Sequence, residues 1–134
     1  RLSGAYLAPR FGFRKVLAAG FAIVAAACFL YPRATAFWGL LAVQGLFGVG
    51  MGLILPLTLY AAIRNIPDHR RGAAMGVYQA VYGVGMFIGP VAAGWIISAL
   101  PTAAEGMAAN FYANGALSLL GVALTLWLLR EKRR

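Results

Sequence analysis

The stretch GVGMFIGPVAAGW, residues 83–95, holds four glycines and a proline and no charged side chain. Glycines grouped in this way occur in phosphate-binding loops at the start of a helix, and also where helices pack closely in a bilayer. The glycines miss the spacing Gly-x-Gly-x-x-Gly, and the uncharged run continues over residues 72–104. A helix of about 20 apolar residues crosses roughly 30 Å of hydrocarbon. The stretch therefore predicts a membrane-spanning helix and excludes a nucleotide site.

The rest of the chain has the same character. Of its 134 residues, 62% are hydrophobic and 11% are charged, against about 45–50% and about 25% in soluble domains. Three more runs are free of charge, over residues 16–32, 34–63 and 106–129. We predict an all-α, polytopic transmembrane helix bundle of four spans. The spans are expected at residues 16–31, 37–63, 72–100 and 109–129.

The charges mark the ends of these spans. The net charge is +9, and ten basic residues lie in residues 1–15, 64–71 and 130–134, if Arg1 is left aside. The opposite side carries only Arg33 and, in an expected outer loop at residues 101–108, Glu105. Basic loops stay in the cytoplasm. The sequence thus indicates a multi-pass protein of the plasma or inner membrane with the lipid bilayer as partner, and argues against a nucleic-acid partner.

Side chains suited to catalysis or metal binding are too few to form a site. Cys28 and His69 are single, and the only acids are Asp68, Glu105 and Glu131, all expected outside the membrane. No pair of carboxylates or metal-binding cluster can be assembled from them. We therefore expect no enzyme, no cofactor and no metal.

Residues 5–15 read AYLAPRFGFRK, and they resemble a cytoplasmic loop motif of the major facilitator superfamily of secondary transporters. That motif reads Gly-x-Leu-Ala-Asp-Arg-x-Gly-Arg-Arg; Arg10, Gly12 and Arg14 match it, whereas Pro9 replaces its aspartate. Span two is similar to the fourth or tenth helix of the family, with Leu41 where an arginine is expected.

A second motif lies on span three. It is similar to the family's antiporter signature Gly-x8-Gly-x3-Gly-Pro-x2-Gly-Gly, and the matching residues are Gly76, Gly85, Gly89, Pro90 and Gly94. The resemblance implies part of a twelve-helix fold whose halves are parallel repeats. Because the loop aspartate and the span-two arginine are missing, and because the chain ends in a basic tail, we expect helices nine to twelve. Helices three to six are the alternative, since the signature is best known from the fifth helix.

The resemblance implies transport of a small organic solute by alternating access, with efflux suggested by the signature and proton antiport if transport is coupled. The missing remainder of the transporter is then a partner. A facilitated-diffusion uniporter of the same fold and a membrane assembly or scaffold subunit that only packs helices are the alternatives.

Polar and methionine side chains recur along one face of spans two and three, which in the family border the central cavity. Amides and hydroxyls in lipid are costly unless they are bonded. They are therefore expected to face protein or solute, either bonding helix to helix or contacting substrate. The cavity candidates are Gln44, Met51, Thr58, Gln79, Tyr82 and Met86.

The cytoplasmic loops are expected to gate the transporter. The start of span three offers free amide groups and the positive end of a helix dipole, and in the resembling family the other half's loop aspartate docks there. The gating candidates are Arg10, Gly12, Arg14, Arg71 and Gly72.

Overall fold

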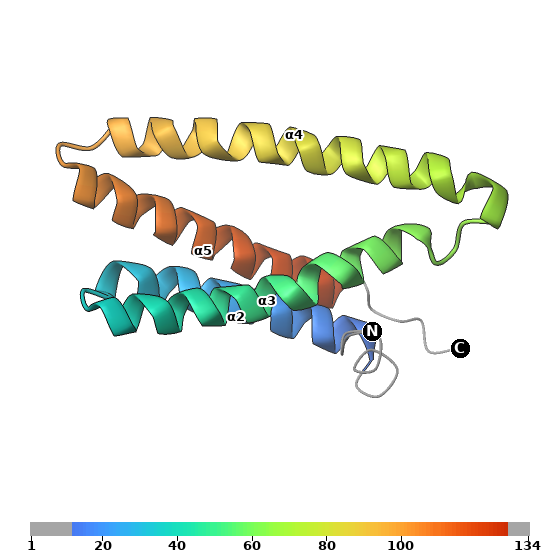
Figure 1. The fold of residues 1–134 in the computed structure, drawn as a ribbon, viewed down its shortest axis with the longest axis horizontal. Helices are drawn as coiled ribbons and strands as arrows, with labels where there is room; N and C mark the ends of the chain where they lie inside the picture. Colours follow the sequence, from blue (N-terminus) through green and yellow to red (C-terminus); the bar gives the residue numbers. More distant parts are fainter. Residues whose placement is uncertain (1–11, 129–134) are drawn as a thin grey trace.

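The structure is a computed structural model that describes residues 12–128. Four long helices make up nearly all of it (Figure 1): α2 (Phe13–Leu30), α3 (Phe37–Ile63), α4 (Arg71–Ser98) and α5 (Ala103–Leu128). Two short 3-10 helices, η1 (Tyr31–Arg33) and η2 (Asp68–Arg70), lie in the connections after α2 and before α4. The all-α prediction of four spans is confirmed, since each helix is long and apolar enough to cross a membrane.

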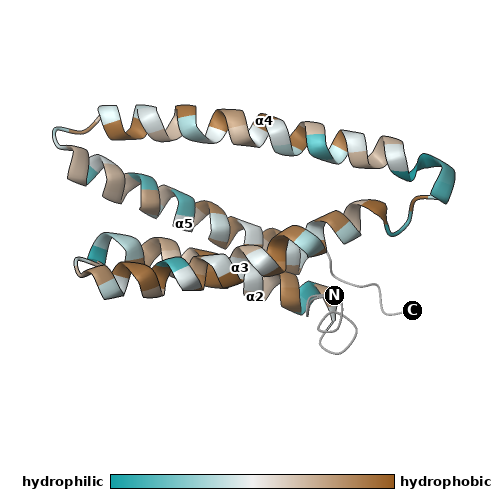
Figure 2. Ribbon diagram, viewed as in Figure 1, coloured by the Kyte–Doolittle hydropathy of each residue, from teal (hydrophilic) through white to brown (hydrophobic). Residues whose placement is uncertain are grey.

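Apolar residues predominate along each helix, the connection between α3 and α4 is hydrophilic, and a few hydrophilic residues interrupt the helices, as along α5 (Figure 2). The windows that define the four spans have mean hydropathies of 1.9, 2.0, 1.7 and 1.3 in chain order. A helix that is hydrophobic all round needs apolar surroundings on every side. The distribution therefore fits helices that lie in a bilayer.

The interior of the described chain lies around α2. This helix packs against both α3 and α5. Its buried residues recur at intervals of three and four, which keeps them on the same sides of the helix over its length. The core cluster combines them with α3 residues and consists of Val16, Leu17, Val24, Cys28, Ile54 and Leu57.

Glycines set how closely α3 approaches α2. A Cβ on Gly50 would lie 2.6 Å from Cγ2 of Val24 and 3.1 Å from the carbonyl oxygen of Gly20. Because glycine has no side chain to separate the helices at this crossing, the two backbones come into direct contact, as small residues permit in membranes. The contact is made by Gly20 and Gly50, whereas Gly48 and Gly52 of the same helix have no atom of residues 12–128 within 4 Å of such a Cβ.

The fourth span begins earlier than its hydrophobicity suggested. The sequence placed residues 101–108 in an outer loop, but α5 begins at Ala103. The hydroxyl of Thr102 accepts a hydrogen bond from the backbone N–H of Glu105 at 3.3 Å, and its carbonyl accepts one from Gly106 at 3.0 Å. These bonds, with an acidic residue in the first turn, stabilise a helix start that hydropathy alone does not detect.

Helix α4 differs from the other three because none of its residues is buried within the described chain. It runs along one side of the molecule and joins the rest at its two ends (Figure 1). A Cβ added at Gly76, Gly85, Gly89 or Gly94 would meet no atom of residues 12–128 within 4 Å. The expectation that these glycines pack helices therefore stays a prediction, and residues 12–128 do not supply their partner.

Candidate functional site

The candidate site lies between α3 and α4, where one hydrogen bond links the two helices. The hydroxyls of Thr58 and Tyr78 are 3.0 Å apart. Thr58 also donates toward the carbonyl oxygens of Ile54 at 2.9 Å and Leu55 at 3.0 Å. Those carbonyls lie in the turn that precedes Pro56, which has no N–H of its own to donate. The Thr58 hydroxyl is thus held by its own helix while it contacts the next one.

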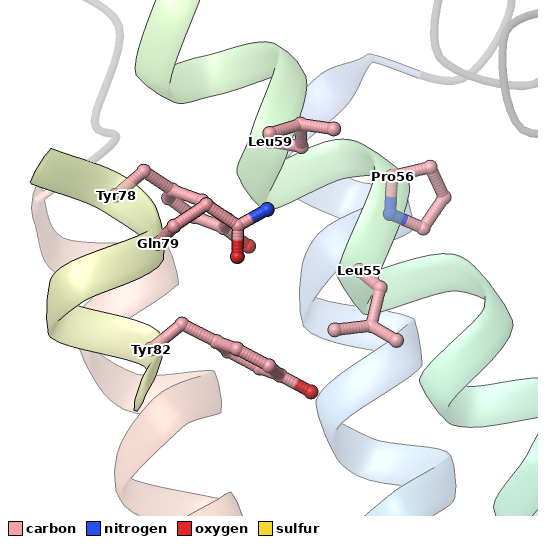
Figure 3. Close-up of a pocket in the computed structure, with 6 residues that line it drawn as sticks. All are labelled: Leu55, Pro56, Leu59, Tyr78, Gln79 and Tyr82. Carbon is pink, nitrogen blue, oxygen red and sulfur yellow. The ribbon is translucent and has the colours of Figure 1, made fainter. Parts of the chain in front are cut away.

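A pocket of about 280 Å³ opens beside this contact. Figure 3 shows side chains from α3 on one side and from α4 on the other, with the tyrosine side chains extending toward α3. The lining residues are Leu55, Pro56, Leu59, Tyr78, Gln79 and Tyr82. Most of this lining is apolar, and the polar atoms are one amide and two phenol hydroxyls. Such a site can hold an organic solute and orient it by a few hydrogen bonds.

Three of the six predicted cavity residues meet at this place. Gln79 and Tyr82 line the pocket, and Thr58 is bonded to Tyr78 at its edge. The helical repeat explains why the pocket forms here. Residues 78 and 82 are four apart and share one face of α4, and residues 55 and 59 share one face of α3 in the same way.

The other three predicted cavity residues lie elsewhere. Gln44 accepts a hydrogen bond from the hydroxyl of Tyr31 near the opposite end of α3. Met51 packs against the core between α2 and α3. Met86 lies one turn beyond Tyr82 and is 63% exposed. None of the three lines the pocket between α3 and α4, so their proposed contact with solute depends on parts of the protein beyond residues 12–128.

Sequence reasoning overlooked the pocket's other lining residues, Leu55, Pro56, Leu59 and Tyr78. Only Tyr78 had a usable signal, since it lies four residues before Tyr82, next to Gln79, and carries a hydroxyl in a charge-free span. The leucines could not have been singled out, because leucine is equally common on lipid-facing surfaces. Which leucines line a pocket is decided by the approach of α4.

The predicted gating residues at the cytoplasmic ends make local contacts. Gly12 precedes α2 with φ of +84°, a backbone conformation that favours glycine. Arg14 donates a hydrogen bond to the carbonyl oxygen of Leu126 near the end of α5, where a cation also complements the helix dipole. Arg10 lies outside the described residues.

The second group of gating residues surrounds the start of α4. Arg71 forms an ion pair with Asp68 at 2.8 Å and donates from Nε to the carbonyl oxygen of Ile66 at 3.2 Å. Gly72 follows within the first turn of α4. These contacts fold the η2 connection against the helix start, and both charged side chains remain exposed.

No group of three or more His, Cys, Asp or Glu side chains in residues 12–128 could hold a metal ion. The two acids of the range, Asp68 and Glu105, lie at helix ends. Neither of them lines the pocket.

Comparison with known proteins agrees with this architecture. The family model of the Major Facilitator Superfamily matches residues 2–134. An uncharacterized MFS-type transporter of Mycobacterium tuberculosis is 29% identical over 92% of the chain and 20% of its own length. The multidrug transporter protein MdtP of Bacillus subtilis is 33% identical over 70% of the chain and 17% of its own length. A probable chloroplastic anion transporter of Arabidopsis thaliana is 33% identical over 66% of the chain and 17% of its own length.

No solved structure matches the chain significantly. The chain spans about a fifth of the length of these curated relatives. The relatives are named as transporters and not as enzymes, in agreement with the expectation that the chain has no enzymatic site. With the family match over nearly its whole length and four membrane-spanning helices, the chain belongs to the Major Facilitator Superfamily.

Proposed function

We propose that this chain forms part of a transporter that moves a small organic solute across the membrane by alternating access. The observation that carries the proposal is the pocket between α3 and α4, in which an amide and two phenols lie on charge-free helices. Uncharged polar groups within a bilayer need partners from protein, water or solute. A solute that enters the pocket satisfies the amide of Gln79, whose side chain has no hydrogen-bond partner among residues 12–128.

Export is the proposed direction. The antiporter-like glycine motif on α4 and the similarity to a protein named as a multidrug transporter support it. We further propose a plasma or inner membrane location with the basic helix ends in the cytoplasm, as the charge distribution favours, and helices nine to twelve as the position in the fold.

Energy coupling requires a group from another part of the transporter, if the transport is coupled to protons. Acidic and basic side chains within the membrane mark proton relays, and the charge-free runs of the four spans contain no Asp, Glu, Lys, Arg or His. Proton antiport therefore depends on an acid in the remainder of the protein. The facilitated-diffusion uniporter stays a second candidate for this reason.

The proposed gate lies at the start of α4. Its first-turn amides and positive dipole end favour an anionic group, which the corresponding loop of the other half of the transporter would supply. Arg71 and Gly72 would then flank the docked loop. A cysteine introduced for Met75, crosslinked to that loop in the full-length protein, should react at a yield that depends on whether solute is present; an unchanged yield counts against the gate.

The main test measures transport by the full-length protein in liposomes. Gln79→Ala should raise the concentration of solute needed for half-maximal transport about tenfold, because one buried hydrogen bond to a solute contributes about 1 kcal/mol or somewhat more. Asn114→Ala is the matched control, since it removes an amide that donates to Asn110 of its own helix and does not line the pocket.

Two outcomes contradict the proposal. If the Gln79→Ala variant and the wild type need the same solute concentration for half-maximal transport, the pocket does not contact the transported solute. A full-length protein that assembles in the membrane and moves no solute across a broad panel supports the scaffold reading instead.

A further inference from the structure

A second pocket lies at the end of the helices where α2 connects to α3 and α4 connects to α5. Figure 1 shows these two connections together at one end of the molecule. The volume of the second pocket is about 360 Å³. It is lined by Tyr31 and Pro32 of η1, by Leu40 of α3, and by the first turns of α5 between Ala104 and Phe111. It shares no lining residue with the pocket between α3 and α4.

The wall of the second pocket is apolar and fixed by a pair of stacked rings. The ring planes of Tyr31 and Phe111 are within 9° of parallel, and their centroids are 4.5 Å apart. The hydroxyl of Tyr31 donates a hydrogen bond to the side chain of Gln44, so the pocket receives the ring of Tyr31 and not an unbonded hydroxyl. The other lining side chains are apolar. A cavity of this kind does not need water and takes apolar ligands.

Two aromatic residues place the second pocket at the level of a membrane interface. Phe37 and Trp38, at the start of α3, are 67% and 78% exposed, and aromatic residues of this kind gather at interfaces. Leu40 lies just inside them on the same helix. On α5 the lining covers residues 104–111, about 10 Å of helix, whereas one leaflet contributes about 15 Å of hydrocarbon. The second pocket therefore lies beside the upper part of the acyl chains of one leaflet.

One positive and one negative side chain adjoin the lining. Arg33 is the only charged residue in the range 16–63, and Glu105 is the only one in the range 72–129. Arg33 directly follows Pro32, Glu105 directly follows Ala104, and both are exposed. Neither side chain forms an ion pair within residues 12–128. The guanidinium can bind a phosphate through two parallel hydrogen bonds, and the carboxylate attracts a cation.

We propose that the second pocket binds one phospholipid with a zwitterionic headgroup. One acyl chain lies against the rings of Tyr31 and Phe111, the phosphate is bound by Arg33, and the positive end of the headgroup is attracted by Glu105. An anionic phospholipid satisfies Arg33 equally well but leaves Glu105 without a cation. The proposal does not depend on the proposed function, because it concerns a resident lipid and not the transported solute.

The preference for this lipid comes from shape and charge. An acyl chain gains no hydrophobic free energy when it leaves the bilayer for an apolar pocket, since both surroundings are equally apolar. An unfilled pocket, however, forfeits the dispersion contacts of its lining atoms. Exposed ion pairs are weak. We therefore expect a site that is occupied continuously and that selects between headgroups by a small factor.

The test uses the purified full-length protein in nanodiscs of equal parts phosphatidylcholine and phosphatidylglycerol. Two photoreactive probes, one with each headgroup, carry the same diazirine in the upper part of one acyl chain. After illumination, mass spectrometry measures the labelling of residues 107–111 relative to that of the whole protein. Both probes should be enriched there, and the phosphatidylcholine probe about threefold more than the phosphatidylglycerol probe, as expected for an exposed charge pair.

Variants separate the pocket from the charges. Ala104→Leu places a larger side chain in the pocket and should reduce the labelling of residues 107–111 to the average of the protein. Ala103→Leu is the matched control, since Ala103 is exposed and does not line the pocket. Arg33→Gln should lower the labelling by both probes about threefold, whereas Glu105→Gln should abolish only the preference between them. Elution of every variant as the wild-type species on size exclusion shows that the helices still assemble.

Four results overturn the proposal: no enrichment of either probe at residues 107–111, equal enrichment of the two probes, equal losses from Ala104→Leu and Ala103→Leu, or displacement of the probes by a transported solute. The last result would assign the second pocket to the path of the solute. A protein that shows the expected labelling but transports nothing supports the lipid site and contradicts only the proposed function.

Discussion

Helices α2 and α4 are similar in hydropathy and opposite in their surroundings. The apolar segments that make them candidate membrane spans have mean hydropathies of 1.9 and 1.7. Yet 44% of the segment in α2 and 0% of the segment in α4 is buried within residues 12–128. Because lipid is as apolar as a protein core, hydropathy measures suitability for the bilayer and carries no information on packing. The pocket lies between α4 and α3, so the helix with no buried residue within residues 12–128 is also the one that lines the candidate site.

Glycine has a different role in each helix pair. Between α2 and α3, Gly20 and Gly50 bring two backbones into contact, while the glycines along the middle of α4 face open space in the described chain. The same residue type therefore indicates a completed contact in one region and a free surface in the other. Substitutions at matched glycines can test whether this contrast persists in the full-length protein.

The largest effect is expected for Gly50→Leu. The new side chain would begin 2.6 Å from Cγ2 of Val24, against a backbone that cannot withdraw without separating α2 from α3. We expect a loss of about 3 kcal/mol in the free energy of unfolding, at the upper end of the usual cost of overpacking. Unfolding of the purified protein by SDS in mixed micelles measures it. Gly52→Leu, on the same helix with open space around it, is the control and should change the stability far less.

Gly106→Ala should have the next largest effect, because Gly106 of α5 packs directly against the backbone of α4. A Cβ at Gly106 would lie 2.6 Å from the carbonyl oxygen and 2.7 Å from Cα of Ile97. Overpacking against backbone is expected to cost about 2 kcal/mol in the same unfolding assay. Gly94→Ala, in open space on α4, serves as the control. A comparable loss of unfolding free energy from Gly94→Ala would mean that the rest of the transporter covers that face of α4. Helix α4 would then be packed in the full-length protein as α2 is, and the contrast between them would not hold.

Thr58→Val should remove the only hydrogen bond that joins the side chains of α3 and α4 in residues 12–128. The substitution keeps the shape and removes the hydroxyl, with an expected loss of about 1 kcal/mol in unfolding free energy. Ser98→Ala is the matched control, since that hydroxyl bonds only to Trp95 of its own helix. Similar losses from both variants would show that the contact between α3 and α4 contributes nothing beyond the helix itself.

The smallest effect is expected for Thr102→Val at the start of α5. It removes the oxygen that accepts the N–H of Glu105, and loss of such a cap costs about 1 kcal/mol or less. Helicity of the first turn, followed by amide hydrogen exchange at residues 103–106, should fall before global stability does. Exchange that stays as slow as in the wild type would show that packing against Ile97 alone holds this end of α5 on α4.

The sequence predicted the helices well and the site in part. Charge-free runs located all four spans, because burying a charge in hydrocarbon is costly whatever the neighbours are. Thr58, Gln79 and Tyr82 could be selected because polar side chains stand out in such runs. Leu55 and Leu59 could not, since an apolar residue on an apolar helix gives no sign of whether it faces lipid, helix or pocket.

By itself the sequence determined that this chain crosses the membrane four times and which ends of its helices carry positive charge, because length and charge act through the bilayer and need no knowledge of contacts. The tertiary structure decided which small residues touch and which polar groups meet. It showed that Gly50 contacts Gly20, although Gly48 and Gly52, which are four residues apart on the same helix, were the pair that the sequence favoured for packing. It also separated Gln44, which bonds to Tyr31, from Gln79, which lines the pocket, although both are amides in charge-free spans. The physical reason is that periodicity defines the faces of a helix, whereas the neighbour of each face depends on how whole helices cross.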